Sequence, residues 1–175
     1  MNVASRTVGV MGSGTFEHEP LASEIGDLLA SLGVNLLTGG GSGVMTSVSR
    51  AFVRAPRKQG VCIGIIPCFS ESDRSRPKDG YPNQFVELAI FTHLPHSGFR
   101  GREDLSRNHI NVLSSAAVIA LPGEEGTASE VSLAVDYRRP VIAYSPDTHL
   151  VDHFPRIVER ATTVDRVREF LIRHL

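Results

Sequence analysis

The chain alternates short apolar runs with longer segments whose apolar residues recur at helical spacing. In the segment 20–32, leucine and isoleucine return every three or four residues, which predicts a helix with one buried face. Gly33 follows where a helix commonly ends in a left-handed cap. Apolar runs typical of buried strands occupy residues 7–11, 35–38, 60–66, 85–90, 117–121 and 141–144. Helices are expected over residues 20–32, 44–53, 102–113, 127–137 and 163–174, the last capped by Thr162 or Thr163.

This alternation of strand and helix predicts the architecture. It is typical of an α/β fold in which a parallel sheet of about six strands has helices on both faces, here a single Rossmann-like domain over residues 1–175. In such folds ligands bind beyond the carboxyl ends of the strands, where the strand order reverses. The polar stretch 67–83 breaks the rhythm, and it is either a lid over that site or a plain surface excursion.

Composition and charge narrow the classes of function. The chain is 41% hydrophobic and 21% charged, values close to those of ordinary globular proteins. Its 18 basic and 19 acidic residues leave a net charge of -1, which argues against sequence-independent binding of nucleic acid. No apolar run approaches the roughly 18 residues of a membrane span, and the first residues lack the apolar core of a signal peptide. We therefore expect a cytoplasmic protein with neither nucleic acid nor membrane as a partner.

Cysteine and histidine are the residue types that suggest a metal. Cys62 and Cys68 lie in an apolar stretch, which is typical of small buried thiols. His93, His96 and His109 lie after a predicted strand and on a predicted helix, but no carboxylate or cysteine completes a ligand set with them. We predict no metal site, and we expect the histidines to line a pocket or to lie at the surface.

A glycine-rich loop runs from Gly39 to Gly43, between a predicted strand and a predicted helix. Glycines let the backbone pass close to a ligand, and the start of the helix beyond them favours an anion such as phosphate. The alternative is a tight turn with no ligand. A shorter glycine break at Gly12 and Ser13 follows the first strand at the same edge of the predicted sheet.

A second loop of this kind, Pro122 to Thr127, follows the strand at 117–121 and opens the next helix. Thr127 has a hydroxyl that suits either a helix cap or a phosphate oxygen. Glu130 lies on the first turn of that helix, where a carboxylate either complements the helix dipole or faces the pocket as a catalytic group. Two such loops at one edge of a sheet strengthen the prediction of a phosphate site.

Arg107 and Asn108 lie on the predicted helix that leads into the strand before the second loop. A planar guanidinium is a frequent partner of phosphate, although an arginine on a helix can also be simply solvated.

Together these motifs resemble the Lonely Guy (LOG) superfamily. The matching features are Gly-Gly-Gly-x-Gly-Val-Met after the second strand, Ser-Arg-Asn before a later strand, and Pro-Gly-x-x-Gly-Thr-x-x-Glu after it. The resemblance covers residues 7–144. It implies a phosphoribohydrolase that cleaves nucleoside 5′-monophosphates to free base and ribose 5-phosphate and is usually a homodimer. A sister branch carries molybdenum cofactor.

The resemblance also implies roles for individual residues. Arg107 and Glu130 would be the catalytic pair, with side chains that converge on a pocket beside Thr127, and hydrolysis would need no metal or cofactor. The candidates for phosphate and ligand binding are Gly12, Ser13, Gly39, Gly40, Gly41, Ser42, Gly43, Met45, Asn108, Pro122, Gly123, Glu124, Glu125, Gly126 and Thr127.

Three functions therefore stay open. The first is hydrolysis of a nucleoside monophosphate, and the second is non-catalytic carriage or sensing of a phosphorylated ligand, with molybdenum cofactor as that ligand. The first glycine loop is one residue shorter than in the hydrolases and in this respect is similar to the carrier branch. The third is that the protein keeps the fold of the family but has an altered ligand site. Glu124 favours this reading, because it stands where the family prefers a second glycine.

Overall fold

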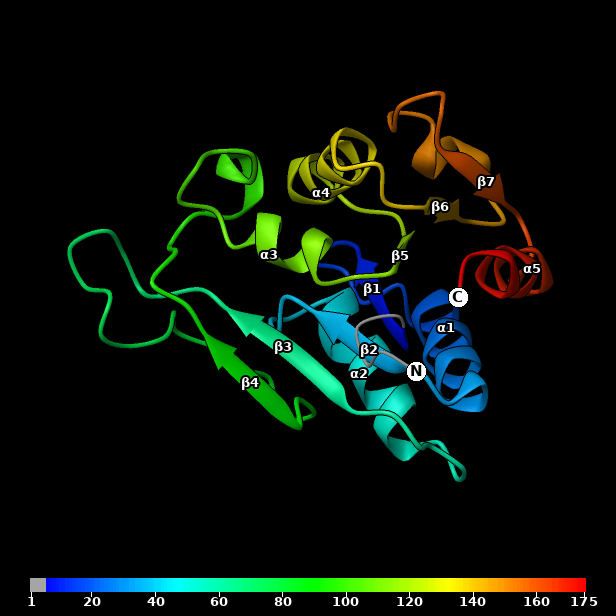
Figure 1. Cartoon of the computed structure of the whole chain (residues 1–175), viewed down its shortest axis with the longest axis horizontal. Coiled ribbons are helices and arrows are strands. Elements are labelled where there is room, and N and C mark those ends of the chain that lie inside the picture. Colours follow the sequence, from blue (N-terminus) through cyan, green and yellow to red (C-terminus); the bar gives the residue numbers. More distant parts are fainter. Residues whose placement is uncertain (1–5) are drawn as a thin grey trace.

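A computed structural model describes residues 6–175. Its centre is a sheet of seven parallel strands in the order β4-β3-β2-β1-β5-β6-β7 (Figure 1). The strands are β1 (Thr7–Met11), β2 (Asn35–Thr38), β3 (Cys62–Ile66), β4 (Leu88–Phe91), β5 (Ala117–Ala120), β6 (Val141–Tyr144) and β7 (Glu159–Ala161). The predicted parallel α/β fold is confirmed, with one strand more than the expected six. The pattern of β7 is too short to recognise in the sequence, since it has three residues and only Ala161 is buried.

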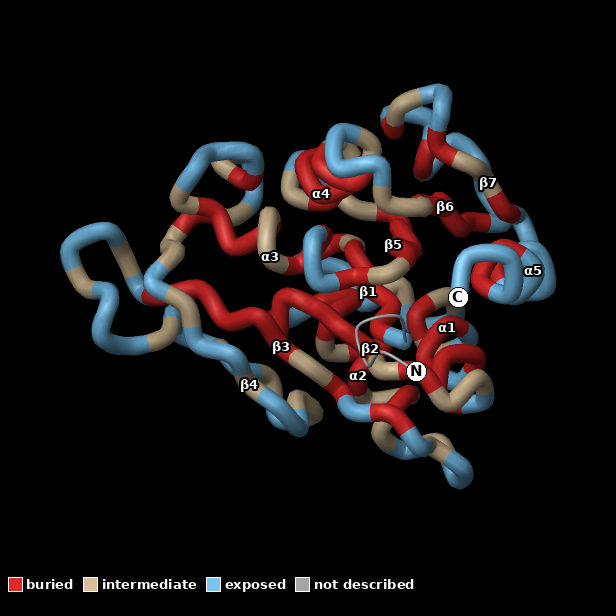
Figure 2. The backbone as a smooth tube through the Cα atoms, in the orientation of Figure 1, coloured by how far each residue is buried: buried red, intermediate tan, exposed pale blue. Residues whose placement is uncertain are grey.

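Five helices cover the two faces of the sheet (Figure 1). On one face lie α1 (Glu19–Leu32), α2 (Val44–Arg54) and α5 (Val164–His174), and on the other lie α3 (Asn108–Leu113) and α4 (Glu125–Asp136). Successive side chains of a strand point to opposite faces, so Ile119 of β5 belongs to the first core while Val118 and Ala120 belong to the second. Figure 2 shows buried central strands, whereas β4 at the edge is largely exposed.

Two expected helix ends are present as predicted. Gly33 caps α1 with a left-handed φ of 66°, and its N–H bonds back to the last turn of the helix. At the start of α5, Thr163 is the cap, because its side chain accepts a hydrogen bond from the N–H of Arg166 at 3.4 Å.

Three predicted boundaries were wrong. Helix α3 begins at Asn108 and not at 102, since the N–H of His96 bonds to the carbonyl of Leu105 and holds the preceding residues in turns. Strand β4 begins at Leu88 because Asn83 organises a turn, accepting a hydrogen bond from the N–H of Phe85. Strand β3 begins at Cys62, two residues later than predicted.

The order of the strands defines where a ligand can bind. Strands β2, β3 and β4 follow one another outward on one side of β1. The chain then returns, and β5 pairs with the other side of β1. The strand order reverses at β1, which is where open parallel sheets form a crevice beyond their carboxyl ends. Among the helices described, none is long and apolar enough to cross a membrane.

Candidate functional site

A cleft of about 560 Å³ opens beyond the carboxyl end of β1, between the loop after β2 and the start of α4. Ten of the residues singled out in the sequence line it: Gly12, Gly39, Met45, Arg107, Asn108, Glu124, Glu125, Gly126, Thr127 and Glu130. The structure thus brings together parts of the chain that are more than a hundred residues apart. The volume of the cleft is in the range of cavities that hold cofactor-sized ligands.

The first turn of α4 forms one wall of this cleft. Glu124 precedes the helix in an extended conformation, and its side chain does not cap the helix. Within residues 6–175, the backbone N–H groups of Glu125, Gly126 and Thr127 have no hydrogen-bond acceptor. Free amides at a helix start carry partial positive charge, so this wall suits an anion.

The second glycine loop packs against the loop after β1. A Cβ added at Gly123 would collide with the Thr127 hydroxyl and would lie 2.7 Å from the backbone nitrogen of Ser13. The N–H of Ser13 donates to the carbonyl of Pro122 at 3.1 Å. Ser13, Pro122 and Gly123 therefore hold the two loops together and lie behind the cleft lining.

The first glycine loop and its neighbours mainly contact other parts of the protein. The N–H of Val44, at the start of α2, donates to the carbonyl of Ser13 at 2.9 Å, and the Ser42 hydroxyl donates to the carbonyl of Gly14 at 2.6 Å. Gly43 has a φ of 64°, and a Cβ there would collide with the same Ser13 carbonyl. Gly40, Gly41, Ser42 and Gly43 thus lie outside the lining of the cleft, and the loop reaches the cleft through Gly39 and Met45.

Arg107 is buried at the floor of the cleft. Its side chain is 5% exposed, and Nε and Nη1 have no hydrogen-bond partner in the described part of the chain. The guanidinium lies directly over Gly39, where a Cβ would overlap it. Of its neighbours, the carboxylate of Glu130 is the charged one, with Oε1 3.6 Å from Nη1.

Glu130 is held from a second side by Asn111. The Asn111 Nδ2 donates to Glu130 Oε1 at 2.8 Å, and Asn111 is fully buried. Burial raises the pKa of Glu130, against the opposing effects of the Arg107 charge and the Asn111 hydrogen bond. Sequence reasoning missed Asn111, although it lies four residues after Arg107 and so on the same face of a helix.

Glu124 lies at the rim of the cleft. Its Oε1 accepts a hydrogen bond from the Ser13 hydroxyl at 2.9 Å. The Ser13 oxygen in turn accepts from the N–H groups of Thr15 and Phe16. The side chain that replaces the family's second glycine is therefore tied to the loop after β1.

The polar segment 67–83 reaches the site at its carboxyl end. Tyr81 lines the cleft, with its ring against the backbone of Gly41. Asn83 anchors it there, since its N–H donates to the Gly40 carbonyl at 2.7 Å and its Nδ2 donates to the Gly41 carbonyl at 2.9 Å. This end of the segment is thus part of the wall of the site.

Ser97, Gly98 and Phe99 also line the cleft and were missed by sequence reasoning. They belong to η2 (Gly98–Arg100) and the residue before it, in the loop between β4 and α3. The available signal was the large apolar Phe99 in a glycine-flanked polar stretch, where no core position is expected.

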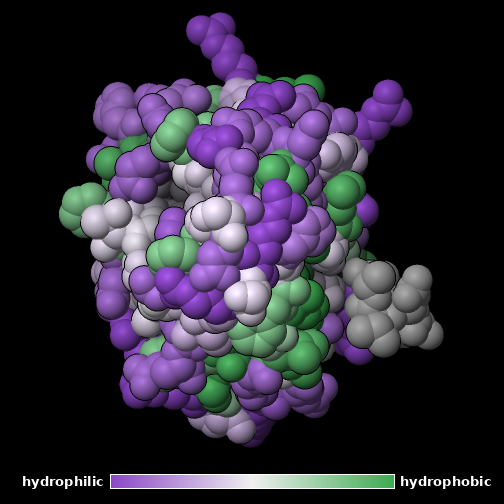
Figure 3. All heavy atoms as spheres, turned by 90° about the vertical axis from the view of Figure 1, so that its left-hand side faces the viewer, coloured by the Kyte–Doolittle hydropathy of each residue, from purple (hydrophilic) through white to green (hydrophobic). Residues whose placement is uncertain are grey.

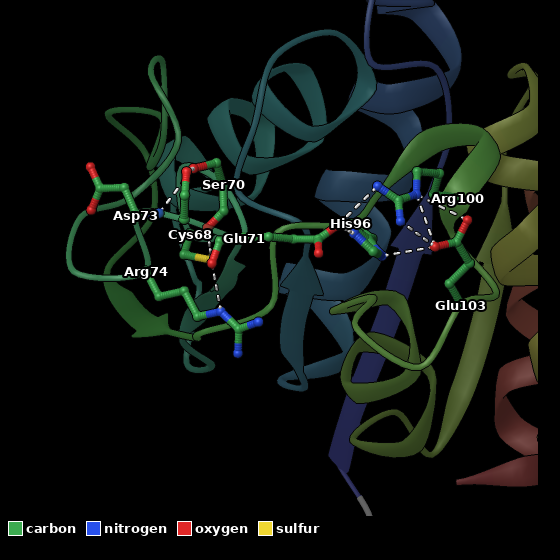
Figure 4. A network of polar contacts seen from close by, with 9 residues as sticks. Cys68, Ser70, Glu71, Asp73, Arg74, His96, Arg100 and Glu103 are labelled. Carbon is green, nitrogen blue, oxygen red and sulfur yellow. Dashed lines mark hydrogen bonds and ion pairs between the residues drawn. The ribbon is translucent and has the colours of Figure 1, made fainter.

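The histidines and cysteines lie apart from the cleft lining. Burial raises the pKa of Cys62 to about 11, and both thiols are free and buried. His93 is exposed, whereas His109 bonds through Nδ1 to the Tyr137 hydroxyl at 2.6 Å. His96 is buried between Glu71 and Glu103, in the network drawn in Figure 4. Over residues 6–175, no group of three or more His, Cys, Asp or Glu side chains could hold a metal ion.

Comparison with known families identifies the scaffold. The model of the SLOG cluster4 family matches residues 5–171. The chain belongs to this family. The superfamily resemblance seen in the glycine loops is thereby confirmed.

Three relatives place this SLOG cluster4 protein among known proteins. An uncharacterized protein from Archaeoglobus fulgidus is 32% identical over 141 residues, which are 79% of this chain and 80% of that protein. The solved molybdenum cofactor binding protein of Rippkaea orientalis is 33% identical, with a TM-score of 0.71 over 95% of both chains. The Moco carrier protein of Chlamydomonas reinhardtii is 26% identical, with a TM-score of 0.66 over 95% of this chain and 98% of that one.

Proposed function

We propose that this SLOG cluster4 protein binds and carries molybdenum cofactor, with the phosphate of that cargo seated in the cleft. Two similar solved structures, at 33% and 26% identity over 95% of this chain, are a molybdenum cofactor binding protein and a Moco carrier protein. Molybdenum cofactor is a phosphorylated pterin, so it brings an anion and a flat ring to the protein. The family and the chemistry of the cleft point to the same class of ligand.

The observation that carries the proposal is the buried guanidinium of Arg107, whose Nε and Nη1 have no hydrogen-bond partner within residues 6–175. Burying a charged group without hydrogen bonds costs several kcal/mol, and a lone carboxylate 3.6 Å away at Glu130 relieves only part of that cost. A phosphate in the cleft would accept hydrogen bonds from Nε and Nη1. It would also meet the free amides of the first turn of α4 and the hydroxyl of Thr127.

This proposal predicts that Arg107 is needed to retain the cofactor. Replacing it by Gln removes charge-assisted hydrogen bonds, so we expect Arg107→Gln to retain at least about tenfold less cofactor than the native chain. Chains purified from a host that makes molybdenum cofactor would be assayed for molybdenum and for bound pterin, the latter as its fluorescent oxidised derivative. Arg107→Lys keeps the positive charge but loses the planar set of N–H donors of the guanidinium. This variant should retain an intermediate amount of cofactor.

Arg102→Gln is the matched control. Arg102 is exposed and paired with Asp136 outside the cleft, and its loss should leave retention unchanged. A thermal melt of each variant separates loss of binding from loss of folding. Equal retention by the native chain and a folded Arg107→Gln would contradict the proposal.

A second candidate function is favoured by Glu130. Its carboxylate lines the same cleft beside Arg107, and burial raises its pKa, a property of groups that donate or accept protons during catalysis. As a phosphoribohydrolase, the protein would hold a nucleoside 5′-monophosphate by its phosphate. Glu130 would stabilise the developing positive charge on the ribose or activate the attacking water.

Release of free base distinguishes this candidate. Native protein would be incubated with purine, pyrimidine and prenylated-adenine 5′-monophosphates. A hydrolase should release base, and Glu130→Gln should lower the rate at least about a hundredfold. Asp136→Asn, which removes a carboxylate from the far end of α4 where it pairs with Arg102 outside the cleft, is the control and should stay active. Absence of base release from every monophosphate would remove this candidate and leave carriage.

The proposal also includes a homodimer or higher homo-oligomer in the cytoplasm. Leu88, Ile90 and Phe91 of the edge strand β4 are between 43% and 62% exposed. Figure 3 shows apolar side chains gathered on the face of the molecule that carries this strand. An apolar strand edge is a surface that proteins usually cover, which supports association.

A further inference from the structure

Two aromatic side chains line the cleft, and they come from two different segments. Tyr81 belongs to the end of the polar segment 67–83, and a Cβ added at Gly41 would lie 2.6 Å from its ring. Phe99 lies on η2 at the other wall. A Cβ at Gly126 would lie 3.2 Å from the Cα of Gly98, so Phe99 follows a residue that packs on the first turn of α4.

The two rings differ from the other apolar residues of the cleft because a ligand can reach them. Met11 is 2% exposed and Met45 is 9% exposed, whereas Phe99 is 78% exposed. Tyr81 is half-buried. An exposed phenylalanine at the edge of a cleft costs solvation free energy unless something covers it, and a flat ring is what an aromatic face binds well.

Each ring is carried on anchored backbone. Asn83 fixes the Tyr81 segment to the carbonyls of Gly40 and Gly41, as described above. On the other side, the carbonyl of Gly98 accepts hydrogen bonds from the N–H of Gly101 at 2.9 Å and from the Ser129 hydroxyl at 3.4 Å. The backbone that carries each ring is therefore held in place by hydrogen bonds.

Glu71 ties the two segments to each other. Its Oε1 lies 2.7 Å from His96 Nε2 and 3.2 Å from Arg100 Nη1 (Figure 4). Arg100 follows Phe99 directly and also pairs with Glu103 at 2.7 Å. The same polar network thus connects the segment that carries Tyr81 to the turn that carries Phe99.

We infer that Tyr81 and Phe99 form a subsite that binds the planar heterocycle of the ligand, such as a pterin or a purine. The inference rests on the proposed function for the position of the phosphate, which Arg107 and the start of α4 would hold at the floor. The heterocycle then extends toward the exposed aromatic faces. Ring stacking of this kind tolerates different heterocycles, because every one of them has a flat face.

The test compares three probes on the native full chain and its variants. Guanosine 5′-monophosphate supplies phosphate and ring, ribose 5-phosphate supplies phosphate alone, and free pterin supplies the ring alone. Affinities are measured by calorimetry, and pterin also by its own fluorescence, which is readable because the chain has no Trp. Chromatography confirms that the nucleotide stays intact during the titration.

Phe99→Ala and Tyr81→Ala should each weaken binding of the nucleotide and of pterin by at least about fivefold. Ribose 5-phosphate should change by less than about twofold. Tyr81→Phe keeps the ring and should bind like the native chain. Phe69→Ala is the matched control, because Phe69 lies on the same segment as Tyr81 but is covered by Arg76 and lies outside the cleft.

Unchanged nucleotide and pterin affinity in both alanine variants would overturn the inference. Equal losses for the nucleotide and ribose 5-phosphate would overturn it too, since the rings would then only shape the cleft. Pterin binding that depends on the rings, together with no binding of either phosphate compound, would contradict the proposed function alone. Ribose 5-phosphate binding as tight as nucleotide binding would contradict the aromatic subsite alone, and no binding of any probe would contradict both.

Discussion

At the scale of single residues, the site is marked by charged groups whose partners are incomplete. Arg107 and Glu130 are buried together, yet Nη1 and Oε1 are 3.6 Å apart, and two guanidinium nitrogens have no acceptor in the part of the chain that the structure describes. A pair evolved only for stability would close that distance, because an imperfect buried ion pair rarely offsets its desolvation. The geometry leaves room for a ligand to complete the pair.

The carboxylate of Glu87, unlike the Arg107–Glu130 pair, has close hydrogen-bond donors. It gives a prediction for the stability of the fold. Its side chain accepts hydrogen bonds from the backbone N–H of Cys62 and from Lys58 Nζ, both at 2.9 Å. Burial acts to raise the pKa of Glu87, but these two donors outweigh it and hold the pKa below the ordinary value of 4.5. A depressed pKa stabilises the fold above pH 4.5, and this contribution is lost as the pH falls through the folded pKa.

We therefore expect Glu87→Gln to lower the free energy of unfolding at pH 7 by roughly 0.5–1 kcal/mol, a figure kept small because the carboxylate is partly exposed. The difference from the native chain should stay constant from pH 7 down to about 4.5 and should shrink as the pH falls further, through the folded pKa. Urea unfolding at several pH values measures it. Glu169→Gln, in an exposed pair with Arg166 on α5, is the control. A difference that stays constant below pH 4.5 as well would disprove this account.

At the scale of elements, the site consists of loops that follow strands and open helices. The loop after β1 packs against the loop after β5 through Gly123, and against the start of α2 through Gly43. The glycines of this site thus serve mainly for close contact between loops. The anion-binding amides belong to α4, where no protein group has occupied them within the described residues.

Substituting Gly123 tests whether this contact holds the cleft in shape. A Cβ there would collide with the Thr127 hydroxyl and crowd the backbone at Gly12 and Ser13, so Gly123→Ala should cost about 1–3 kcal/mol of stability and weaken phosphate binding. Gly14→Ala in the neighbouring loop is the control, since the nearest atom to its Cβ would be 3.9 Å away. Its stability should change by less than about 0.5 kcal/mol. Urea unfolding and titration with ribose 5-phosphate measure both effects, and equal stability of the two variants would contradict the prediction.

At the scale of the whole molecule, the order of the strands assembles the site. Because β1 lies between β2 and β5, the loops that follow these three strands meet at one edge of the sheet. The connection between β4 and α3 starts at the same edge, because β4 is parallel to β3, and it brings Gly98 against α4 and Phe99 to the cleft. Residues separated by more than a hundred positions thereby surround one cleft.

The sequence alone determined the layout of this protein. Short apolar runs located six of the seven strands, and helical periodicity located the five helices, although it made α3 too long. These patterns missed β7, which has three residues, and placed the start of α3 too early, because long-range hydrogen bonds hold residues 102–107 in turns. Motif spacing located the glycine loops, Arg107 and Glu130.

Only the tertiary structure decided which of these residues face the cleft. Gly40 to Gly43 lie outside the cleft lining, and the hydrogen bonds of their neighbours are satisfied within the protein. Glu125, Gly126 and Thr127 at the start of α4 line the cleft with N–H groups that have no acceptor within residues 6–175. Tyr81 belongs to the site through packing against Gly41, which no local pattern encodes, and the local signals at Asn111 and Phe99 did not say which distant segments they would meet. The physical reason is that periodicity and turn chemistry act over a few residues, while burial and the pairing of charges depend on where distant segments pack.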